Sequence, residues 1–367
     1  MNGSIGKFAV LKHLATSLLV LASGAAHAAI FCPGNEADFR QALATAATNG
    51  ENDEIRLRVG TYYTGGVKFS MTSTEAKSLA ISGGWSDSLT LFCSIQSPSA
   101  SATILDGQHI TAVLDISAYA FGSGSAAATV SLSNLTLRNG YTNTNGEAAG
   151  LLIGTGNQTL RLQNTIQTGH AHNLYGSIYN NAVTLIGYGD VYVVNNALSS
   201  LSSKYANLGI FTVNASQTVF LTNNTLSLAG AGFNTLLDAN NGTAYRIVNN
   251  AIVTAGGYGL AFNSRNASDL IRTWMYNNIG TYNVNGMFNG IAPQADVGNF
   301  PNVDPKFVSA TDLRPAAGSP LVNLGLNSPY GGVPSIDLDG NPRVDLGIID
   351  VGAYESTRER IFANGFD

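Results

Sequence analysis

Asparagine recurs at one position of a repeating pattern through the middle of this chain. Each aligned asparagine follows a short strand-like stretch, such as residues 245–248, and the unequal intervals between them (30, 32, 28, 26 and 28) exclude a rigid short repeat. The aligned residues are Asn134, Asn164, Asn196, Asn224, Asn250 and Asn278. Each interval holds about three strand-like stretches separated by Gly and Asn turns. Because one such unit cannot bury its own apolar face, the units must stack on one another. We therefore predict an all-β fold, a single right-handed parallel β-helix.

The repeated asparagine is best interpreted as structural rather than catalytic. Stacked sheets use Asn in ladders, in which each side-chain amide bonds to the amide above and below. Asn also tolerates the left-handed backbone that a tight bend requires. We expect such a ladder at one bend of the β-helix, formed by Asn164, Asn196, Asn224, Asn250 and Asn278.

The amino-acid composition favours a strand-rich fold and limits the kinds of molecule that the protein can bind. Only 11% of residues are charged while Gly reaches 41, which disfavours helices and suits strands joined by tight turns. The net charge of −5 and the absence of a basic run argue against a nucleic-acid partner, which normally requires a face rich in Lys and Arg. Neutral partners fit this composition better.

The N-terminal segment, residues 1–28, has the layout of a secretory signal peptide. Lys7, Lys12 and His13 precede an apolar run over residues 14–22, and small residues lead to Ala28, after which we predict cleavage. The apolar run is too short for a stable membrane span, and no later stretch approaches the required length. We expect a secreted or outer-surface protein without a transmembrane segment, and a monomer.

Two further features concern the N-terminal third. Export to an oxidising compartment predicts a disulfide between Cys32 and Cys93. Residues 36–47 form an amphipathic pattern with Phe39 and Leu43 on one side, and Asn49 and Gly50 end it. We expect a helix there that caps the apolar core of the β-helix, because the ends of a strand stack need covers.

Both ends of the chain resemble known families. The helix pattern followed by residues 53–57 and 60–62 is similar to the opening of exported pectate-lyase-like β-helix proteins. Residues 304–307, 318–321, 337–343 and 350–355 resemble the choice-of-anchor Q group of bacterial β-helix proteins. The resemblance implies the fold and an extracellular location, but no assigned reaction.

With this resemblance the chain divides into five expected segments. The last of them, residues 356–367, resembles a short terminal motif of exported proteins and is either a sorting signal or a disordered end. The segments are a signal peptide (1–28), an N-terminal cap with the first coils (29–110), central coils (111–300), C-terminal coils with the family motif (301–355) and the tail (356–367).

Catalysis on this fold would need specific side chains. A polysaccharide lyase needs a cation beside a Lys or Arg base, and a hydrolase needs clustered carboxylates. Arg246 and Arg272 are separated by about one coil length, so we expect them in one strand row of neighbouring coils; with Lys204 they are the candidate catalytic residues. Asp190 and Asp238 are candidate Ca²⁺ ligands. Scattered solvated charges are the alternative that the sequence favours.

Histidines and tyrosines supply candidate binding residues. His170 and His172 alternate along an extended segment, so both could reach one metal or one sugar hydroxyl, but without a third ligand an exposed turn is favoured. Tyr192 and Tyr245 could stack on sugars or simply line coil faces. Residues 337–341 imitate half of a Ca²⁺ loop, but Ile348 stands where Glu is needed, which favours a structural turn.

Two hypotheses of function remain. The first is a non-catalytic surface or secreted protein that binds a polysaccharide or cell-surface glycan along its lateral face. The alternative is a polysaccharide lyase that acts on an acidic polysaccharide. No cofactor is required, and Ca²⁺ is possible.

Overall fold

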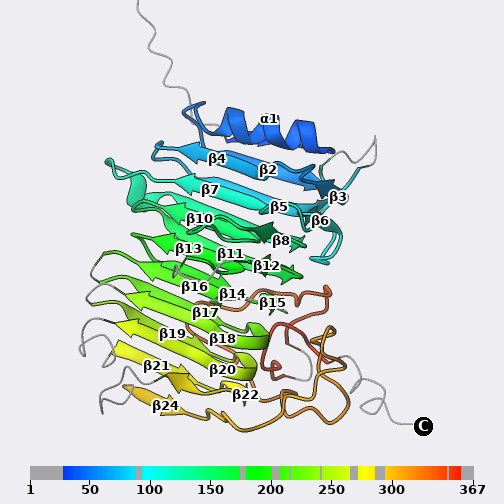
Figure 1. Cartoon of the computed structure of the whole chain (residues 1–367), viewed down its shortest axis with the longest axis vertical. Helices are drawn as coiled ribbons and strands as arrows, with labels where there is room; N and C mark the ends of the chain where they lie inside the picture. The colour runs from blue at the N-terminus through cyan, green and yellow to red at the C-terminus, as the bar shows by residue number, and fades with distance from the viewer. Residues whose placement is uncertain are drawn as a thin grey trace, which may run out of the picture.

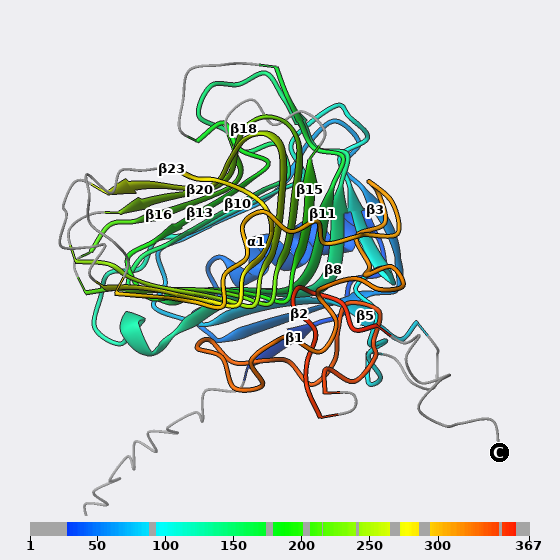
Figure 2. The same ribbon diagram turned by 90° about the horizontal axis from the view of Figure 1, so that it is seen from below.

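The computed structural model describes residues 28–356, except for 88–92, 174–178, 201–205, 215, 240–241, 265–271, 286–293 and 345–346. Its parallel strands wind into a β-helix of about eight turns, which confirms the predicted fold class. Figure 1 shows the coils stacked along the long axis, and Figure 2 shows three faces around the core. No helix among these residues is long and apolar enough to cross a membrane.

Face 1 carries the longest column of strands and lies at the bottom of Figure 2. Its strands are β1 (Ala29–Phe31), β2 (Asp53–Arg58), β5 (Leu79–Trp85), the first halves of β8 (Thr129–Arg138) and β11 (Thr159–Thr168), β14 (Val191–Val194), β17 (Thr218–Thr222), β19 (Ala244–Val248), β21 (Thr273–Tyr276) and β24 (Ala295–Val297).

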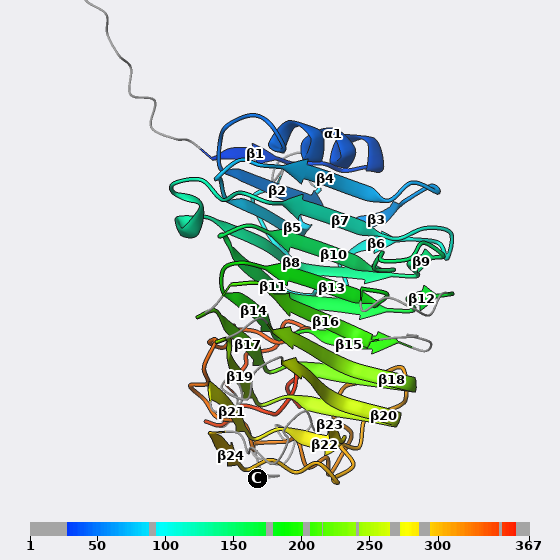
Figure 3. The same ribbon diagram turned by 60° about the vertical axis from the view of Figure 1, so that its left-hand side comes forward.

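Faces 2 and 3 complete each coil, and their strands are visible in Figure 3. Face 2 comprises β3 (Gly60–Tyr63), β6 (Thr103–Asp106), the second halves of β8 and β11, β15 (Ala197–Ser200), the first parts of β18 (Thr225–Ala239) and β20 (Ala251–Ser264), and β22 (Ile279–Thr281). Face 3 comprises β4 (Phe69–Ser73), β7 (Leu114–Ala118), β10 (Leu151–Thr155), β13 (Val183–Gly187), β16 (Ala206–Thr212), the later parts of β18 and β20, and β23 (Val284–Asn285). A short 3-10 turn, η1 (Ser125–Ala127), and a small pair, β9 (Tyr141–Thr142) with β12 (Ala171–His172), lie outside these columns.

Alternation along each strand builds the core. Leu162, Val193, Leu221 and Ile247 lie in register on four successive strands of face 1, and all are fully buried. The residues between them point outward, because successive side chains of a strand face opposite sides. The exterior of each face is therefore the surface on which a site can be built.

Helix α1 (Glu36–Ala46) covers the N-terminal end of this core, as predicted (Figure 1). The side chain of Asn35 caps it by accepting a hydrogen bond from the Asp38 backbone N–H at 2.9 Å. Phe39 is fully buried, with its ring 4.8 Å from that of Phe69 on β4. The helix thus closes the open edge of the first coil.

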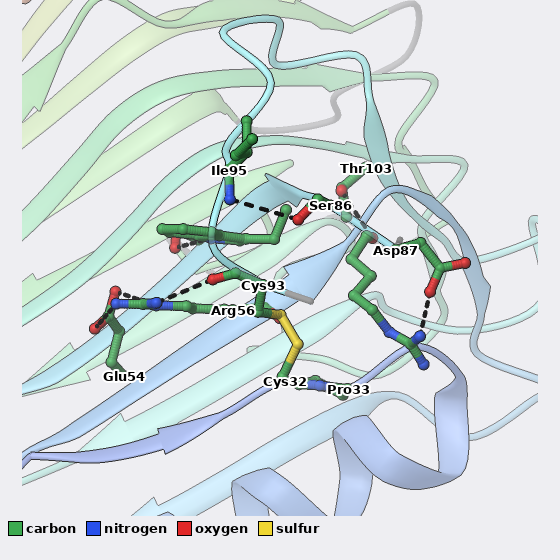
Figure 4. Close-up of a disulfide and its surroundings, with 12 residues drawn as sticks. Cys32, Pro33, Glu54, Arg56, Ser86, Asp87, Cys93, Ile95 and Thr103 are labelled. Atoms are coloured by element: carbon green, nitrogen blue, oxygen red, sulfur yellow. Dashed lines mark hydrogen bonds and ion pairs between the residues drawn. A yellow bond between two sulfur atoms is a disulfide. The ribbon is translucent and has the colours of Figure 1, made fainter. Parts of the chain in front are cut away.

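The predicted disulfide between Cys32 and Cys93 is confirmed (Figure 4). It joins the segment before α1 to the loop after β5. Beneath it, Arg56 donates a hydrogen bond to the Cys93 carbonyl at 3.0 Å and pairs with Glu54 at 2.8 Å. The cap is therefore covalently tied to the second coil.

The asparagine ladder is present at four of the five predicted positions. Asn196 donates through Nδ2 to Asn224 Oδ1 at 3.0 Å, Asn224 to Asn250 at 3.0 Å, and Asn250 to Asn278 at 2.8 Å. Each acceptor Oδ1 also takes the backbone N–H of the asparagine before it. We call these four residues, all fully buried, the inner column.

The prediction was wrong for Asn164, which lies one position out of this register. Thr165 occupies the inner position, donating its N–H and hydroxyl to Asn196 Oδ1 at 2.9 and 2.8 Å. Asn164 pairs instead with Asn195 at 2.7 Å. The ladder also extends to Asn299, which the sequence analysis missed.

A second, outer column carries the left-handed backbone that we had assigned to the ladder. Its six residues have φ between 50° and 58°, and each immediately precedes the inner position of its coil. They are Asn134, Asn164, Asn195, Asn223, Asn249 and Asn277. The bend therefore uses two neighbouring residues for two separate tasks.

Residues 301–356, which we call the strap, do not form the expected C-terminal coils. They run back outside the corner between faces 1 and 2 (orange to red, Figure 2). The strap is held by the outer column: Asn249 donates to the Leu326 carbonyl at 3.0 Å and accepts from the Leu326 N–H at 2.9 Å. Asn223 donates to the carbonyl of Gly352 at 3.4 Å.

The motifs that resemble the choice-of-anchor Q group fold the strap onto itself. Arg343, 1% exposed, donates to the Gly352 carbonyl at 2.9 Å and pairs with Glu355 at 3.0 Å. The Asp337 carboxylate accepts the backbone N–H groups of Asn341 at 2.7 Å and Glu355 at 2.9 Å. These contacts occupy both Asp337 oxygens, so the structural turn accounts for residues 337–341.

Candidate functional site

One exterior row of face 1 collects aromatic and arginine side chains from five successive coils. We call this row the stripe. Its residues are in register on β11, β14, β17, β19 and β21, and each is partly exposed. They are Arg161, Tyr192, Phe220, Arg246 and Trp274. At about 4.8 Å per coil, four steps give the stripe a length of about 19 Å.

The stripe residues stack on one another along the coil axis. The Arg161 guanidinium carbon lies 3.9 Å from the centroid of the Tyr192 ring. The Tyr192 and Phe220 rings are 4.4 Å apart and within 15° of parallel, and the Arg246 guanidinium lies 4.4 Å from the Trp274 ring. Because the ring faces contact each other, we infer that ring edges and guanidinium N–H groups are what the stripe offers to a ligand.

The strap forms a wall along one side of the stripe. The Tyr330 ring is 5.5 Å from the Arg246 guanidinium and 5.3 Å from the Trp274 ring, and its side chain is 43% exposed. Thr222 anchors it by donating to the Tyr330 carbonyl at 2.6 Å. At Gly331 a Cβ would approach the Phe220 Cβ to 2.9 Å, so the strap lies close against the sheet here.

Three arginines on or beside face 1 have no carboxylate of the described residues within ion-pair distance: Arg161, Arg246 and Arg272. Among the described residues, Arg246 donates to two carbonyl oxygens, those of Tyr245 at 3.0 Å and Arg272 at 2.7 Å. Burial lowers the pKa of the Arg246 guanidinium. In contrast, Lys68 on the opposite part of the coil is paired with Asp115 at 3.0 Å.

The structure does not place the two predicted catalytic arginines in one row. Arg246 is in register with Trp274, so the expectation that Arg272 shares its row was wrong; Arg272 precedes β21 and donates to the Gly242 carbonyl at 3.0 Å. The prediction failed because coils differ in length, so an interval that matches one coil does not give the register of the next. Lys204 lies outside the described residues.

The two candidate Ca²⁺ ligands lie on different faces. Asp190 borders face 1, where it accepts the Thr218 N–H at 2.8 Å. Asp238 lies on face 3 in β18 and accepts from Asn263 at 2.8 Å. No group of three His, Cys, Asp or Glu among the described residues is arranged to hold a metal ion.

Both histidines were wrongly predicted as ligands, and the exposed turn was wrong too, because both are buried. His170 is 1% exposed; its Nδ1 accepts the Gly140 N–H at 3.1 Å, and its Nε2 lies 3.2 Å from the side-chain oxygen Oε1 of Gln167. Burial lowers the pKa of His170 to about 3, so it is neutral. His172 Nε2 lies 2.8 Å from the Glu147 carbonyl oxygen.

Of the two tyrosines, only Tyr192 lies on the surface. Tyr245 points into the core, is 1% exposed and packs edge to face on Phe262 at 5.5 Å. The prediction that Tyr245 contacts a sugar was therefore wrong. Its position just before Arg246 places it on the inner side of β19, as alternation requires.

Sequence reasoning missed Arg161, Phe220 and Trp274. The signal was available, because every stripe residue lies three positions before an outer-column asparagine, as Arg161 does before Asn164. Alignment on the inner asparagine concealed this offset at Asn164. Alignment of the coils on the outer-column asparagines therefore identifies the exterior rows more reliably than alignment on the inner column.

Comparison with known proteins adds no relative: no protein-family model, no curated protein and no solved structure matches this chain.

Proposed function

We propose that this protein is a non-catalytic, exported glycan-binding protein, and that an anionic polysaccharide lies along the stripe of face 1. The observation that carries the proposal is the presence of Arg161 and Arg246 on face 1, and of Arg272 just before β21, without described carboxylate partners, in a chain of net charge −5. Cations left without acidic partners are available to an acidic ligand.

The chemistry of the stripe supports an acidic, extended ligand. Guanidinium groups bind carboxylates and sulfates through paired N–H donors. Arg161 and Arg246 are three coil steps apart, about 14 Å, so a chain that carries repeated acidic groups can reach both. The ring edges of Tyr192 and Phe220 supply apolar contacts between them. Tyr330 adds a polar rim from the strap.

A lyase is the second candidate, because burial lowers the pKa of Arg246, which is the change that a general base requires. The export signal in residues 1–28 and membership of the choice-of-anchor Q group likewise belong to the proposal. They are supported by the sequence motifs, by the disulfide and by the Arg343–Glu355 contact that these motifs form.

The proposal is tested by fluorescence titration of the full chain. Trp85 and Trp274 are its two tryptophans, so Trp85→Phe leaves Trp274 as a reporter within the stripe. We expect polygalacturonate, alginate or heparin to change this fluorescence, and we expect the affinity to fall at least tenfold in Arg161→Gln/Arg246→Gln and to weaken with salt. Arg314→Gln, on the strap and paired with Asp312, is the matched control.

Two outcomes would overturn this function. Equal affinity of the double variant and the control would remove the stripe from the binding site. Growth of absorbance from unsaturated uronate in the presence of Ca²⁺, lost in Arg246→Ala, would replace binding with lyase activity.

A further inference from the structure

Face 3 carries a second group of aromatic side chains, distinct from the stripe, on and beside the exterior of β10, β13 and β16. We call it the platform. It includes two ring pairs: Phe121 with Tyr188, at 4.8 Å and 85°, and Tyr179 with Phe211, at 4.6 Å and 48°. Tyr119 is its fifth member.

The strands of face 3 leave room for these rings. At Gly154 an added Cβ would lie 2.2 Å from the Tyr119 hydroxyl oxygen, so Tyr119 lies flat across β10. At Gly209 it would lie 2.8 Å from the Phe211 ring. The partly buried Ile186 is in register with Gly154 on one side and with Phe211 on the other. Two exterior glycines and one aliphatic residue thus give an apolar floor.

Two rings of the platform are exposed to solvent, whereas Phe211 is buried beneath them at 5% exposure. Phe121 is 53% exposed and Tyr179 36%. Phe121 and Tyr188 meet edge to face, so at least one ring face of this pair is not covered by its partner. Exposed aromatic surface of this kind typically marks an interaction site.

The charged groups that border the platform are paired with one another, with one lysine shared by two carboxylates. The Asp115 carboxylate is neutralised by Lys68 at 3.0 Å, and Lys68 also pairs with Glu147 at 2.5 Å. Burial raises the pKa of Tyr119, and the nearby Asp115 carboxylate raises it further, so the phenol keeps its proton. Phenols both donate and accept hydrogen bonds.

We propose that the platform is a second binding site, for a neutral sugar chain. A pyranose ring has apolar C–H faces that pack on aromatic rings and hydroxyls that pair with phenols, and it carries no charge to be matched by a site whose ions are already paired. The site is independent of the proposed function of the stripe, which requires anionic ligands.

Isothermal titration of the full chain with cellohexaose, laminarihexaose and mannohexaose tests this site. We expect at least one to bind, with affinity reduced at least tenfold in Phe121→Ala and Tyr188→Ala and reduced less in Tyr119→Phe. Tyr63→Ala is the control, because Tyr63 is 46% exposed at a different position. Unchanged melting temperatures show that the variants fold.

The results separate the two sites. Arg161→Gln/Arg246→Gln leaves neutral-sugar binding unchanged if the platform is independent. Absence of binding to all three oligosaccharides, or binding that survives Phe121→Ala and Tyr188→Ala, overturns the platform and leaves the stripe untouched. Self-association that is abolished by Phe121→Ser would assign the platform to a second copy of the chain and overturn it equally.

Discussion

The inner and outer asparagine columns use the same residue at adjacent positions, yet they stabilise different parts of the molecule. Inner residues such as Asn250 bond to asparagines and backbone of the coils above and below. Outer residues such as Asn249 adopt the left-handed backbone and bond to the strap. Neighbouring residues therefore have different roles: the inner asparagine stacks the coils, and the outer asparagine holds the strap.

This difference matters for the candidate site. The stripe is positioned by the coils, and its spacing depends on the inner column. Tyr330, the wall of the stripe, is positioned by the strap and so depends on the outer column. A substitution in one column should therefore leave the stabilisation by the other column intact and measurable.

The largest expected effect comes from releasing the strap. Arg343→Ala leaves the Glu355 carboxylate buried without its cation, which typically costs about 3–5 kcal/mol. We expect hydrogen exchange to accelerate at the backbone N–H groups of Leu326 and Gly352, which bond to the outer column, and not at those of the inner column.

Arg314→Ala is the control, because its pair with Asp312 is exposed and contributes about 1 kcal/mol or less. Equal acceleration in strap and coils would mean that the strap and the coils unfold as one unit, and the comparison would fail.

The next effect separates the two columns directly. Asn250→Ala removes a buried amide with four hydrogen bonds and orphans partners that include the Leu221 carbonyl, at an expected cost of about 2–4 kcal/mol in urea unfolding. Asn249→Ala should cost about 1–2 kcal/mol, because the freed strap groups can reach water.

Asn249→Gly sharpens this result. Glycine loses the same side-chain bonds but accepts the φ of 57° without strain, so it should be about 1 kcal/mol more stable than Asn249→Ala. The same pair of substitutions at Asn250 should show no such gain from glycine, since Asn250 is not among the residues with positive φ. A gain of equal size at both positions would contradict the division of tasks.

The sequence predicted the architecture because repetition is a property of composition and spacing. The period, the alternation and the cap helix all follow from local patterns such as Phe39 and Leu43 on one helix face. Register was harder to predict. Coils of unequal length put Arg246 in register with Trp274 rather than with Arg272, and Thr165 hid the one-residue shift at Asn164.

Burial explains the remaining failures. His170 and Tyr245 belong to residue types that occur both inside and outside proteins, and their partners, Gly140 and Phe262, are contributed by other coils or by the far side of the same coil. Local reasoning could not predict the strap, because its contacts with the outer column join residues separated by 47 positions or more, as Asn277 and Leu324 are.

The last expected effect concerns the dependence of stability on pH. It is absent at neutral pH and appears only in acid. Neither asparagine column titrates, so Asn250→Ala and Asn249→Ala should keep the pH dependence of the parent protein. His170 differs, because burial lowers its pKa in the folded state to about 3, whereas an unfolded histidine titrates near about 6.5. Between these values the unfolded chain binds a proton that the folded chain does not, so stability is complete above pH 6.5 and is lost as the pH falls.

At pH 4.5 the loss should reach about 2–3 kcal/mol relative to neutral pH, and His170→Gln should abolish that part of it. His109→Gln is the matched control: its charge lowers the pKa of His170 only as a secondary cause after burial, so the acid sensitivity should persist. Free energies of unfolding from urea titrations at pH 7 and 4.5 measure both. If His170→Gln retains the full acid sensitivity, the buried imidazole is not its source, and other titrating groups would have to supply it.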